Sequence, residues 1–209
     1  APMMVSMMPP RDHFNPDGSV ARQRLASAGR PGPLVQVGIM NGEGALLPTG
    51  ESGEIVVRGS LVMRGYYKDP KATQEASRHG WHHTGDIGYL DGDGFLYTVD
   101  RAKDMIISGG FNVYSAEVEQ VLMQHPDVQD SAVVGLPDEK WGERVVAVLQ
   151  LHAGRSVDAE AIKTFVKSRI GSVKAPKQVE VWADLPRSKV GKVLKKEVRA
   201  SLLQKLSSS

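Results

Sequence analysis

The stretch DRAKDMIISGGFNVYSAEVE, residues 100–119, decides how the chain is interpreted, because the sequence pattern changes within it. Before it, short alternating runs are separated by glycine-rich turns, which is typical of antiparallel strands. After it, strand-like runs alternate with helical ones, which favours a compact domain that contains both. We therefore expect an α/β (α+β) fold, with a small β-rich subdomain over residues 1–99, a boundary at 100–103 and a compact C-terminal domain over 104–209.

The N-terminal part is expected to hold loop and short strands. Residues 1–33 are rich in Met, Pro and Gly and show no sustained period, so they predict loop. The segment DGDG (91–94) is similar to the start of a calcium loop, but it lacks the spaced acidic ligands and the closing Glu. It therefore predicts a hairpin turn rather than a metal site. Strands are expected over residues 34–40, 53–59, 88–91 and 94–100.

The C-terminal part is expected to be a short sheet flanked by about three helices. Ser115 is a candidate N-cap of the first helix, which Pro126 ends. Asp158 is the candidate N-cap of the second helix, and Gly171 lies just past its end. The third helix is expected over residues 192–206, with one apolar face made of Leu194, Val198, Leu202 and Leu206. Strands are expected over residues 130–137, 144–152 and 178–182.

Composition and charge limit the classes of function. The 209 residues are 41% apolar and 24% charged with a net charge of +2, which gives no argument for nucleic acid or an anionic membrane. Residues 171–209 carry nine Lys/Arg against three Asp/Glu, which suits an anionic small molecule at least as well as a polyanion. The lack of cysteine excludes disulfides, thiolate metal sites and cysteine nucleophiles. No apolar run approaches a membrane span and no signal-peptide pattern is present, so a cytoplasmic protein is expected.

Three segments carry candidate site residues, each with a plainer alternative. Asp86, after Thr-Gly, could accept hydrogen bonds from a ribose diol, or the three residues could form an ordinary turn. Ser-Gly-Gly (108–110) lets the backbone approach a narrow ligand, or forms a bulge or turn between strands. Lys192 follows Gly191 on a loop and could reach an anionic centre as a compact point charge, and spacing alone does not decide.

Two other residue pairs have plainer interpretations. Lys195 and Lys196 are expected to cover the polar face of the last helix. His82 and His83 are adjacent in a strand-like setting, so their side chains should point to opposite sides. They would make a poor metal pair, and surface or packing roles are expected.

Six segments follow one another in the order found in the adenylate-forming superfamily. They are GEIVVRG (53–59), MRGYYKDPKAT (63–73), GWHHTGDIGYLDGDGFLY (80–97), DRAKDMIISGGFNVYSAEVE (100–119), HPDVQDSAVVGLPDEKWGERVVAVL (125–149) and LPRSKVGKVLKKEVR (185–199). The superfamily contains acyl-CoA synthetases, peptide-synthetase adenylation domains and beetle luciferases. The resemblance covers about residues 34–206 and looks closest to the fatty-acid and aryl-acid CoA ligases, of which SGGFNVYSAEVE is typical.

The resemblance implies a two-step reaction with ATP, Mg²⁺ and coenzyme A. A carboxylate attacks the α-phosphate of ATP to give acyl-AMP and pyrophosphate, and the thiol of coenzyme A then displaces AMP to give a thioester. Between the steps the C-terminal domain rotates about a hinge, residues 100–103, and presents a different face to the same active site. Lys103 matches the hinge position at which the family carries Asp or Lys.

The motif matches imply roles residue by residue. Asp86 would hold the ribose hydroxyls, and Arg101 would support the ribose and phosphate side. Lys192 would be the catalytic lysine of the adenylation step, in contact with the attacking carboxylate and the α-phosphoryl oxygens. The residues implied in coenzyme A binding are Gly109, Gly110 and Asn112 along the pantetheine path, Trp141 beside it, and Lys174 and Lys177 at the nucleotide phosphates.

The resemblance leaves part of the family's machinery unmatched. The family's Ser/Thr/Gly-rich phosphate loop ending in Pro-Lys is absent from the sequence, and so is the aromatic-Gly-x-Thr-Glu loop that serves the phosphates and Mg²⁺. The acyl pocket also belongs to the missing part. We therefore expect the last subdomain of the large AMP-binding domain plus the whole C-terminal domain, inactive without the missing N-terminal domain. A small carboxylic acid, ATP and CoA are the expected ligands, and homo-oligomers are left open.

Two alternatives stay open at this point. The chain could be the tail of an adenylation enzyme that loads a carrier protein, although it ends soon after the lysine motif with no carrier serine segment. It could also be a non-catalytic nucleotide- or CoA-binding module that kept the fold. The presence together of Asp86, Arg101, Gly109, Gly110 and Lys192 argues against simple decay.

Overall fold

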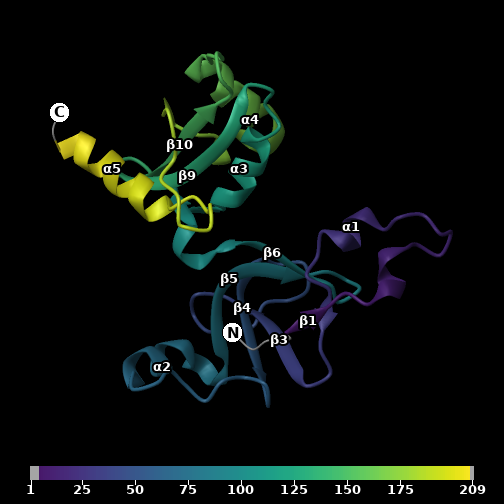
Figure 1. Ribbon diagram of the computed structural model, residues 1–209. Coiled ribbons are helices and arrows are strands. Elements are labelled where there is room, and N and C mark those ends of the chain that lie inside the picture. Colours follow the sequence, from purple (N-terminus) through teal and green to yellow (C-terminus); the bar gives the residue numbers. More distant parts are fainter. Residues whose placement is uncertain (1–4, 208–209) are drawn as a thin grey trace. The chain divides into compact units, whose positions relative to one another are not determined.

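The computed structural model describes residues 5–207 (Figure 1). The chain divides into two compact units, Ala1–Ala102 (unit 1) and Lys103–Ser209 (unit 2). Each unit has its own sheet and its own core. The α/β (α+β) fold class is thereby confirmed, whereas a hinge rotation about residues 100–103 stays a prediction.

Unit 1 is built on a four-stranded antiparallel meander, in which each strand pairs with the next along the chain. Its strands are β3 (Val35–Met40), β4 (Gly53–Gly59), β5 (His82–Leu90) and β6 (Leu96–Arg101). Ile55 and Val57, two residues apart on β4, point to the same side and join Ile39 and Leu96 in the core. Helix α2 (Pro70–Ala76) lies between β4 and β5 in the chain.

Two expectations for unit 1 are wrong. β5 begins at His82 rather than at residue 88, so Thr84–Asp86 lies within a strand and not in a plain turn. Residues 1–33 are not all loop, because the backbones of two short segments pair in an antiparallel manner. The elements in this region are β1 (Ser6–Met7), η1 (Pro10–His13), α1 (Arg22–Leu25) and β2 (Arg30–Pro31).

The hairpin turn expected at DGDG is confirmed. It joins β5 to β6, and the Asp91 carboxylate accepts the backbone N–H groups of Asp93 and Phe95 at 3.0 and 2.8 Å. The side chain of Asp91 therefore accepts backbone N–H groups that would otherwise need a carbonyl partner. This is the usual reason for Asp at the start of such a turn.

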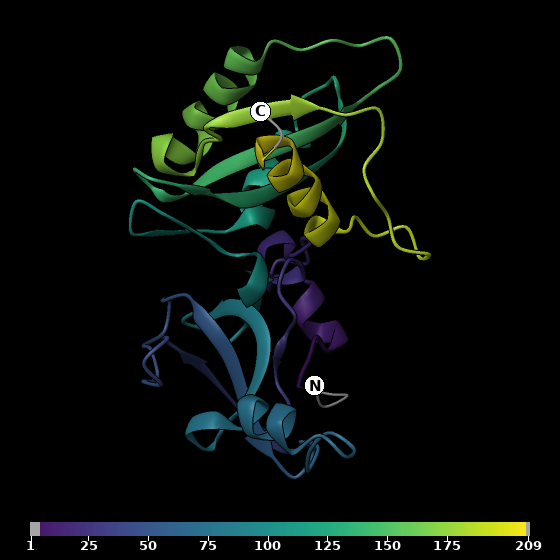
Figure 2. The same cartoon turned by 90° about the vertical axis from the view of Figure 1, so that its left-hand side faces the viewer.

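Unit 2 is a mixed sheet with helices on both faces (Figures 1 and 2). The long antiparallel pair β9 (Val128–Asp138) and β10 (Gly142–Leu151) forms its centre. β11 (Gln178–Val181) pairs with β10 in parallel, and the hairpin of β7 (Ile106–Ser108) and β8 (Phe111–Val113) meets the start of β10. The α-helices are α3 (Ser115–Leu122), α4 (Ala159–Lys174) and α5 (Lys195–Ser207).

Both faces of β9 and β10 are buried, because successive side chains of a strand point to opposite sides. Val133, Val145 and Leu149 belong to the core under α3 and α4. Val134 and Val146 belong to a second core under α5. The nearly continuous apolar runs AVVGL and VVAVL are the sequence signal of this two-sided burial.

Helices α3 and α5 begin at other positions than expected. Tyr114 occupies the N-cap position of α3, and Ser115 is buried in the first turn. α5 begins at Lys195 rather than at residue 192, because residues 187–193 form a separate turn closed by an antiparallel bridge. One contact links the starts of the two helices: the Lys195 ammonium donates to Ser115 Oγ at 2.7 Å.

Helix α4 agrees with the sequence at its start and at the break by Gly171, and it has a further short segment that the sequence did not predict. The Asp158 carboxylate accepts the Ala161 N–H at 2.9 Å, so the expected N-cap is confirmed. Gly171 breaks the helical geometry with φ of +85°, but helical structure continues to Lys174. The glycine therefore ends the first helical segment, as expected, and a second short segment follows it.

The expected apolar face of α5 is correct at Val198 and Leu202 but not at its two ends, because Leu194 precedes the helix and Leu206 is exposed. Leu202 is 1% exposed, whereas Leu206 is 47% exposed. Leu203 packs against the core under α5 in its place. The helical spacing of apolar residues therefore extends to Leu206, although the last turn of α5 no longer packs against the sheet.

The different burial of Leu202 and Leu206 allows two alanine substitutions on the same helix to be compared. Leu202→Ala should lower the free energy of unfolding by about 2–4 kcal/mol, because it leaves a cavity against the sheet. Leu206→Ala should change it by no more than about 0.5 kcal/mol. Urea unfolding followed by circular dichroism measures both values, and equal losses would contradict this packing of α5.

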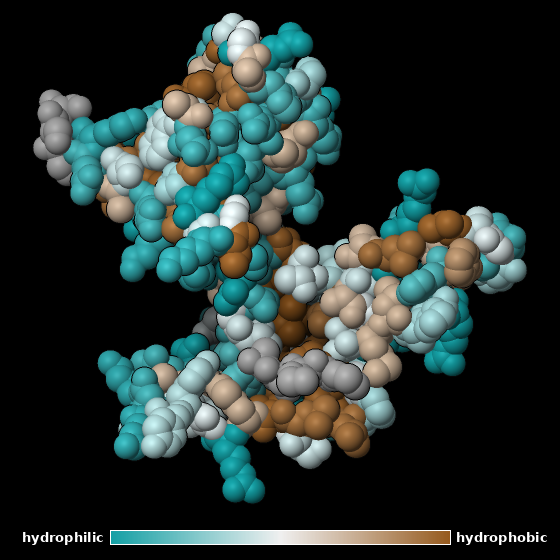
Figure 3. Space-filling model, in the orientation of Figure 1, coloured by the Kyte–Doolittle hydropathy of each residue, from teal (hydrophilic) through white to brown (hydrophobic). Residues whose placement is uncertain are grey.

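Unit 1 exposes apolar side chains that its own core does not cover. Figure 3 shows hydrophobic residues gathered over the β3 side of the sheet and beside α1. Phe14, Val20, Leu25, Leu34 and Leu46 are all more than 40% exposed.

Candidate functional site

In unit 1, the antiparallel pairing of β5 and β6 sets Asp86 opposite Arg101. The Arg101 Nε lies 2.7 Å from Asp86 Oδ1, and the two side chains are 55% and 36% exposed. An ion pair this exposed contributes at most about 1 kcal/mol to stability. The pair presents two groups that a ligand can use: acceptor oxygens for a diol and a cation for an anionic neighbour.

The backbone that carries Asp86 is held by four polar contacts. Thr84 Oγ1 donates to the Ile55 carbonyl at 2.7 Å and accepts the Asp86 N–H at 3.1 Å. The Gly85 N–H donates to Glu54 Oε1 at 3.1 Å, and Glu54 Oε2 lies 2.7 Å from His83 Nδ1. Asp86 is therefore positioned before any ligand arrives, and His83 has the packing role expected for it.

His82 is buried, at 5% exposed, and follows the alternation of the strand, which directs neighbouring side chains to opposite sides. Burial, together with the charge of His83, lowers the pKa of His82 below its usual value of 6.5. The folded state therefore disfavours the imidazolium, and the unfolded state binds more protons once the pH falls below about 6.5.

The sign of the resulting pH dependence follows directly. The contribution of neutral His82 to stability is complete above about pH 6.5 and is lost as the pH falls toward the lowered pKa. Unit 1 should therefore unfold at lower urea concentration at pH 5 than at pH 7, and His82→Gln should reduce that difference. His79→Gln, at an exposed position, is the matched control. A pH difference unchanged in His82→Gln would contradict the assignment.

In unit 2, Lys192 lies on a tight turn before α5. The Ser188 N–H donates to the Lys192 carbonyl at 2.8 Å, and the Lys192 N–H donates to Ser188 Oγ at 3.2 Å. Gly191 has φ of +82°, a conformation that favours glycine. The Lys192 side chain is exposed, and its ammonium makes no hydrogen bond or ion pair with residues 5–207. The amine is thus presented to solvent by an ordered backbone.

Lys195 is not the solvated residue that the sequence suggested. Its ammonium lies 2.9 Å from Glu119 Oε1, and both side chains are less than 20% exposed. The same Glu119 oxygen accepts the Val133 N–H at 2.8 Å, so α3, α5 and β9 meet at one polar cluster. The cluster fixes the start of α5, three residues after Lys192. Lys196 is exposed, as expected.

A crevice of about 150 Å³ lies at the β7–β8 hairpin, and we call it the Trp141 crevice. It is lined by Ser108, Phe111, Trp141, Ser172, Val173 and Lys177. The Gly109 N–H donates to the Trp141 carbonyl at 2.8 Å. Gly109 has φ of +59°, and a Cβ there would come within 2.9 Å of the Trp141 ring. Glycine is therefore required for the ring to lie against this backbone.

The structure brings together three of the residues implied in coenzyme A binding. The Lys177 ammonium lies 5.3 Å from the centroid of the Trp141 ring and donates to the Ser172 carbonyl at 2.7 Å. Burial, together with the charge of Lys167, lowers the pKa of Lys177. A Cβ at Gly109 would meet the same ring, so Gly109, Trp141 and Lys177 lie close together in the structure.

The other three implied residues do not line the Trp141 crevice. The Lys174 ammonium is paired with Glu117 at 2.7 Å. Gly110 has φ of +82°, and a Cβ added there would meet no atom within 4 Å. Asn112 is exposed on β8. The roles of these three residues in binding stay predictions.

Sequence reasoning missed two lining residues that stand next to the glycines. The Ser108 hydroxyl is buried and has no hydrogen-bond partner among the described residues. Phe111 is mostly exposed and forms one wall. Both belong to the segment SGGF, so the glycines were the signal that could have found them.

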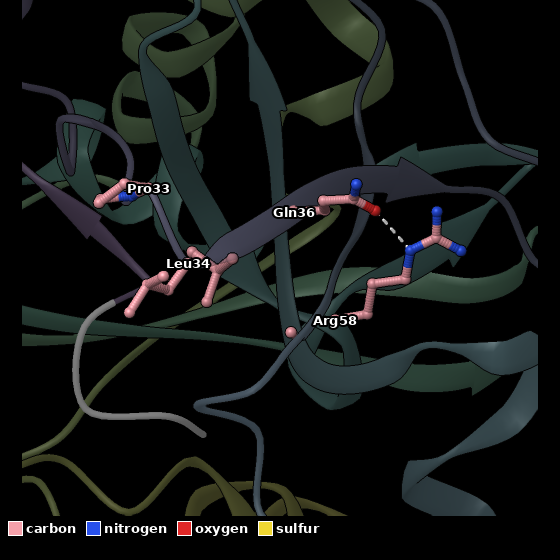
Figure 4. A pocket seen from close by; sticks show the side chains of 6 residues that line it. Pro33, Leu34, Gln36 and Arg58 are labelled. Atoms are coloured by element: carbon pink, nitrogen blue, oxygen red, sulfur yellow. Dashed lines mark hydrogen bonds between the residues drawn. The ribbon is translucent and has the colours of Figure 1, made fainter.

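Two other hollows contain few of the predicted site residues. A cavity of about 570 Å³ in unit 2 is lined by Lys103, Lys195, Lys196 and Arg199, among others, and Lys103 itself is exposed. A hollow of about 440 Å³ on unit 1 is lined by Leu34 and by Gln36 and Arg58, whose side chains point toward each other and form a hydrogen bond (Figure 4). The hinge role predicted for Lys103 therefore stays a prediction, and neither hollow is assigned a ligand.

The described part of the chain offers no metal cluster and no membrane helix. Residues 5–207 contain no group of three or more His, Asp or Glu side chains placed to hold a metal ion. Within the same range, no helix combines the length and the apolarity that crossing a membrane requires.

Comparison with known families matches both units. Residues 3–67 match the model of the AMP-binding enzyme family, and residues 117–192 match the model of the AMP-binding enzyme C-terminal domain. A medium/long-chain-fatty-acid–CoA ligase of Mycobacterium tuberculosis is 44% identical over 96% of this chain and 35% of its own length. The chain spans about a third of the length of the curated relatives it matches.

Two solved structures share the fold. The o-succinylbenzoate CoA synthetase of Bacillus subtilis, in complex with its acyl-adenylate intermediate, superposes with a TM-score of 0.80 at 37% identity, over 93% of this chain and 38% of that one. An amide bond synthetase from Marinactinospora thermotolerans gives a TM-score of 0.78 at 40% identity, over 90% and 38%. With both family models, the ordered motifs and these relatives in agreement, the chain belongs to the adenylate-forming superfamily and is similar to the C-terminal third of acid–CoA ligases.

Proposed function

We propose that this chain is the C-terminal portion of an ATP-dependent acid–CoA ligase that forms acyl-AMP and then acyl-CoA. The observation that carries the proposal is the placement of two different sites at opposite ends of β10. Ser108, at the Trp141 crevice, is paired with Gly142 at the start of the strand. Arg187, at the Lys192 turn, is bonded to Gln150 near its end.

The separation of the two sites argues for two chemical steps. From residue 142 to residue 150, β10 makes eight extended steps, which span about 26 Å. One set of reacting atoms cannot meet both sites at once, so unit 2 would have to turn between the steps. Lys103 begins unit 2, which agrees with a hinge at residues 100–103.

In the first step, a carboxylate oxygen of the acid bonds to the α-phosphorus of ATP, and the bond to the pyrophosphate oxygen breaks. Negative charge builds on the α-phosphoryl oxygens as this happens. The unpaired ammonium of Lys192 would stabilise that charge, and Asp86 would accept hydrogen bonds from the ribose hydroxyls. Arg101, held beside Asp86, would support the phosphate side.

In the second step, the sulfur of coenzyme A bonds to the acyl carbonyl carbon, and AMP leaves with the electron pair of the broken acyl–oxygen bond. Gly109 leaves room for the narrow pantetheine arm, and Trp141 and Lys177 would contact the ligand beside it. The hydroxyl of Ser108, buried without a partner among the described residues, would gain one.

Mg²⁺ would neutralise the phosphates of ATP when bound. The described residues offer no cluster of three or more candidate ligands, so its ligands are expected in the part of the relatives that this chain does not span. The same part would supply the phosphate loop and the acyl pocket, and it would cover the apolar surface of unit 1. This partner domain, the cytoplasmic location and the acid itself stay predictions.

The test is an acceptor assay on a protein that contains this chain together with the missing N-terminal domain. With ATP, Mg²⁺ and a panel of fatty and aryl acids, coenzyme A should give a thioester and AMP. Thioester formed only on a carrier protein would favour the loading enzyme, and an amide formed only with an amine would favour the alternative that the amide bond synthetase suggests. Nucleotide binding without AMP release from any acid would favour a non-catalytic module.

The 209-residue chain alone is expected to show no acid-dependent exchange of pyrophosphate into ATP. The reason is that adenylation needs the phosphate loop and the acid pocket, and the sequence contains neither motif. Radioactive pyrophosphate exchange measures this directly. Exchange above background with any acid of the panel would contradict the expectation.

A further inference from the structure

The Lys192 turn is exposed, yet one side chain ties it to the sheet of unit 2. The guanidinium of Arg187 donates from one terminal nitrogen to the Gly191 carbonyl at 3.3 Å. Its other terminal nitrogen donates to Gln150 Oε1 at 2.9 Å and lies 2.7 Å from Asp130 Oδ2. Gln150 and Asp130 are direct partners in the β9–β10 ladder. Arg187 therefore joins a rigid cross-strand pair to the peptide bond that precedes Lys192.

From these contacts we infer that Arg187 is a positioning residue for Lys192. The inference rests on the proposed function for its kinetic consequence only. It goes beyond the assignment of Lys192, because it identifies the residue that determines where the ammonium can lie. Arg187 does not need to contact a substrate for this role.

The rest of the turn cannot supply the same constraint. The other hydrogen bonds join Ser188 to Gly191 and Lys192, and the Leu194 N–H to the Pro186 carbonyl, so they shape the turn without attaching it to the sheet. Val190 at its tip is 79% exposed, so it contributes little packing. On the C-terminal side, the cluster of Lys195 and Glu119 fixes the start of α5. Val193 packs against the core under α5, so the segment is held at residues 187, 193 and 195, and Arg187 is the attachment on the N-terminal side of Lys192.

Arginine suits this position for a geometric reason. Its planar fork has donors that point in different directions, so it can serve the sheet and the turn at the same time. A lysine at 187 has one ammonium at the end of a flexible stem and would satisfy the Asp130 carboxylate or the Gly191 carbonyl, but not hold both in fixed orientation. Arg187→Lys therefore keeps the charge and removes the positioning.

The first arm of the test measures order in the 209-residue chain and does not depend on any activity. The amide order parameters of Gly191 and Lys192, from ¹⁵N relaxation, should fall from about 0.85 to below about 0.6 in Arg187→Lys. The matched control is Arg155→Lys, which alters an exposed arginine paired with Asp127. Asp130→Asn provides a second variant that keeps the shape of the site and weakens the contact. Unchanged order parameters in both Arg187→Lys and Asp130→Asn would overturn the inference.

The second arm measures both half-reactions in the complete ligase. Arg187→Lys should slow adenylate formation at least tenfold through kcat, with little change in KM for ATP, and leave thioester formation from supplied acyl-AMP within about twofold. Equal losses in both half-reactions would mean a general structural role and would overturn the inference. If Lys192→Ala also leaves adenylation intact, the proposed function of Lys192 fails, and the order parameters still decide whether Arg187 holds the turn.

Discussion

Lys192→Ala in the complete ligase is expected to slow adenylate formation by about 10²–10³-fold, the loss typical when one preorganised charge-stabilising group is removed. The exposed ammonium has no competing partner among residues 5–207, so none of its charge is committed to an ion pair there. Thioester formation from supplied acyl-AMP should stay within about twofold, because that step would use the Trp141 crevice at the other end of β10. Acid-dependent pyrophosphate exchange measures the first quantity, and AMP release from supplied acyl-AMP measures the second.

The matched control for this variant is Lys189→Ala. Lys189 lies on the same turn, is exposed and makes no ion pair with the described residues. It carries the same charge as Lys192 at a different place on the turn, so its loss should leave both half-reactions intact. If Lys189→Ala slowed adenylation as much as Lys192→Ala, the effect would come from the net charge of the turn and not from one positioned lysine.

Gly109→Ala is expected to slow the other half-reaction, thioester formation, and to preserve adenylate formation. Its Cβ would lie within 2.9 Å of the Trp141 ring, so the ring must shift by part of an ångström, and the Trp141 crevice changes shape. A misplacement of about 1 Å in a reacting complex costs on the order of 10²-fold in rate. Thioester formation should fall by about that factor, whereas pyrophosphate exchange should be preserved.

Gly110→Ala separates this effect from backbone strain. Both glycines have positive φ, +59° at Gly109 and +82° at Gly110, so alanine is strained at either position. A Cβ at Gly110 meets no atom within 4 Å, so the Trp141 ring is not displaced. Thioester formation by Gly110→Ala should therefore exceed that by Gly109→Ala at least tenfold. Equal losses would assign the effect to strain in the hairpin.

The parts of the fold that depend on local pattern could be predicted from the sequence. The apolar runs of β9 and β10, the Asp91 turn and the Asp158 cap each follow from residues that are neighbours in the chain. The errors arose where a distant residue decides the outcome. Lys195 follows the period of a polar helix face, but its partner Glu119 lies on another helix, far away in the chain.

In the candidate site, too, some residues could be found from sequence motifs, and others only from the folded structure. The resemblance made Lys192, Asp86 and Gly109 candidates, because each stands in a short motif of the family. The motifs could not identify Arg187 as the residue that holds the turn, since its partners on β9 and β10 are brought near only by the sheet. The alternative of an ordinary turn at Thr84–Asp86 is wrong for a similar reason: Asp86 pairs with Arg101 on β6, and the segment is an irregularity in the β4–β5 pairing within strand β5.

The central claim is that the two ends of β10 serve two different steps. The most direct measurement is a crossed comparison in the complete ligase, with single-turnover rates of both half-reactions for Lys192→Ala and Gly109→Ala. Lys192→Ala should slow adenylation and leave the rate of thioester formation unchanged. Gly109→Ala should slow thioester formation and leave the rate of adenylation unchanged. If each variant slowed both steps by the same factor, the two sites would act as one, and the account would be wrong.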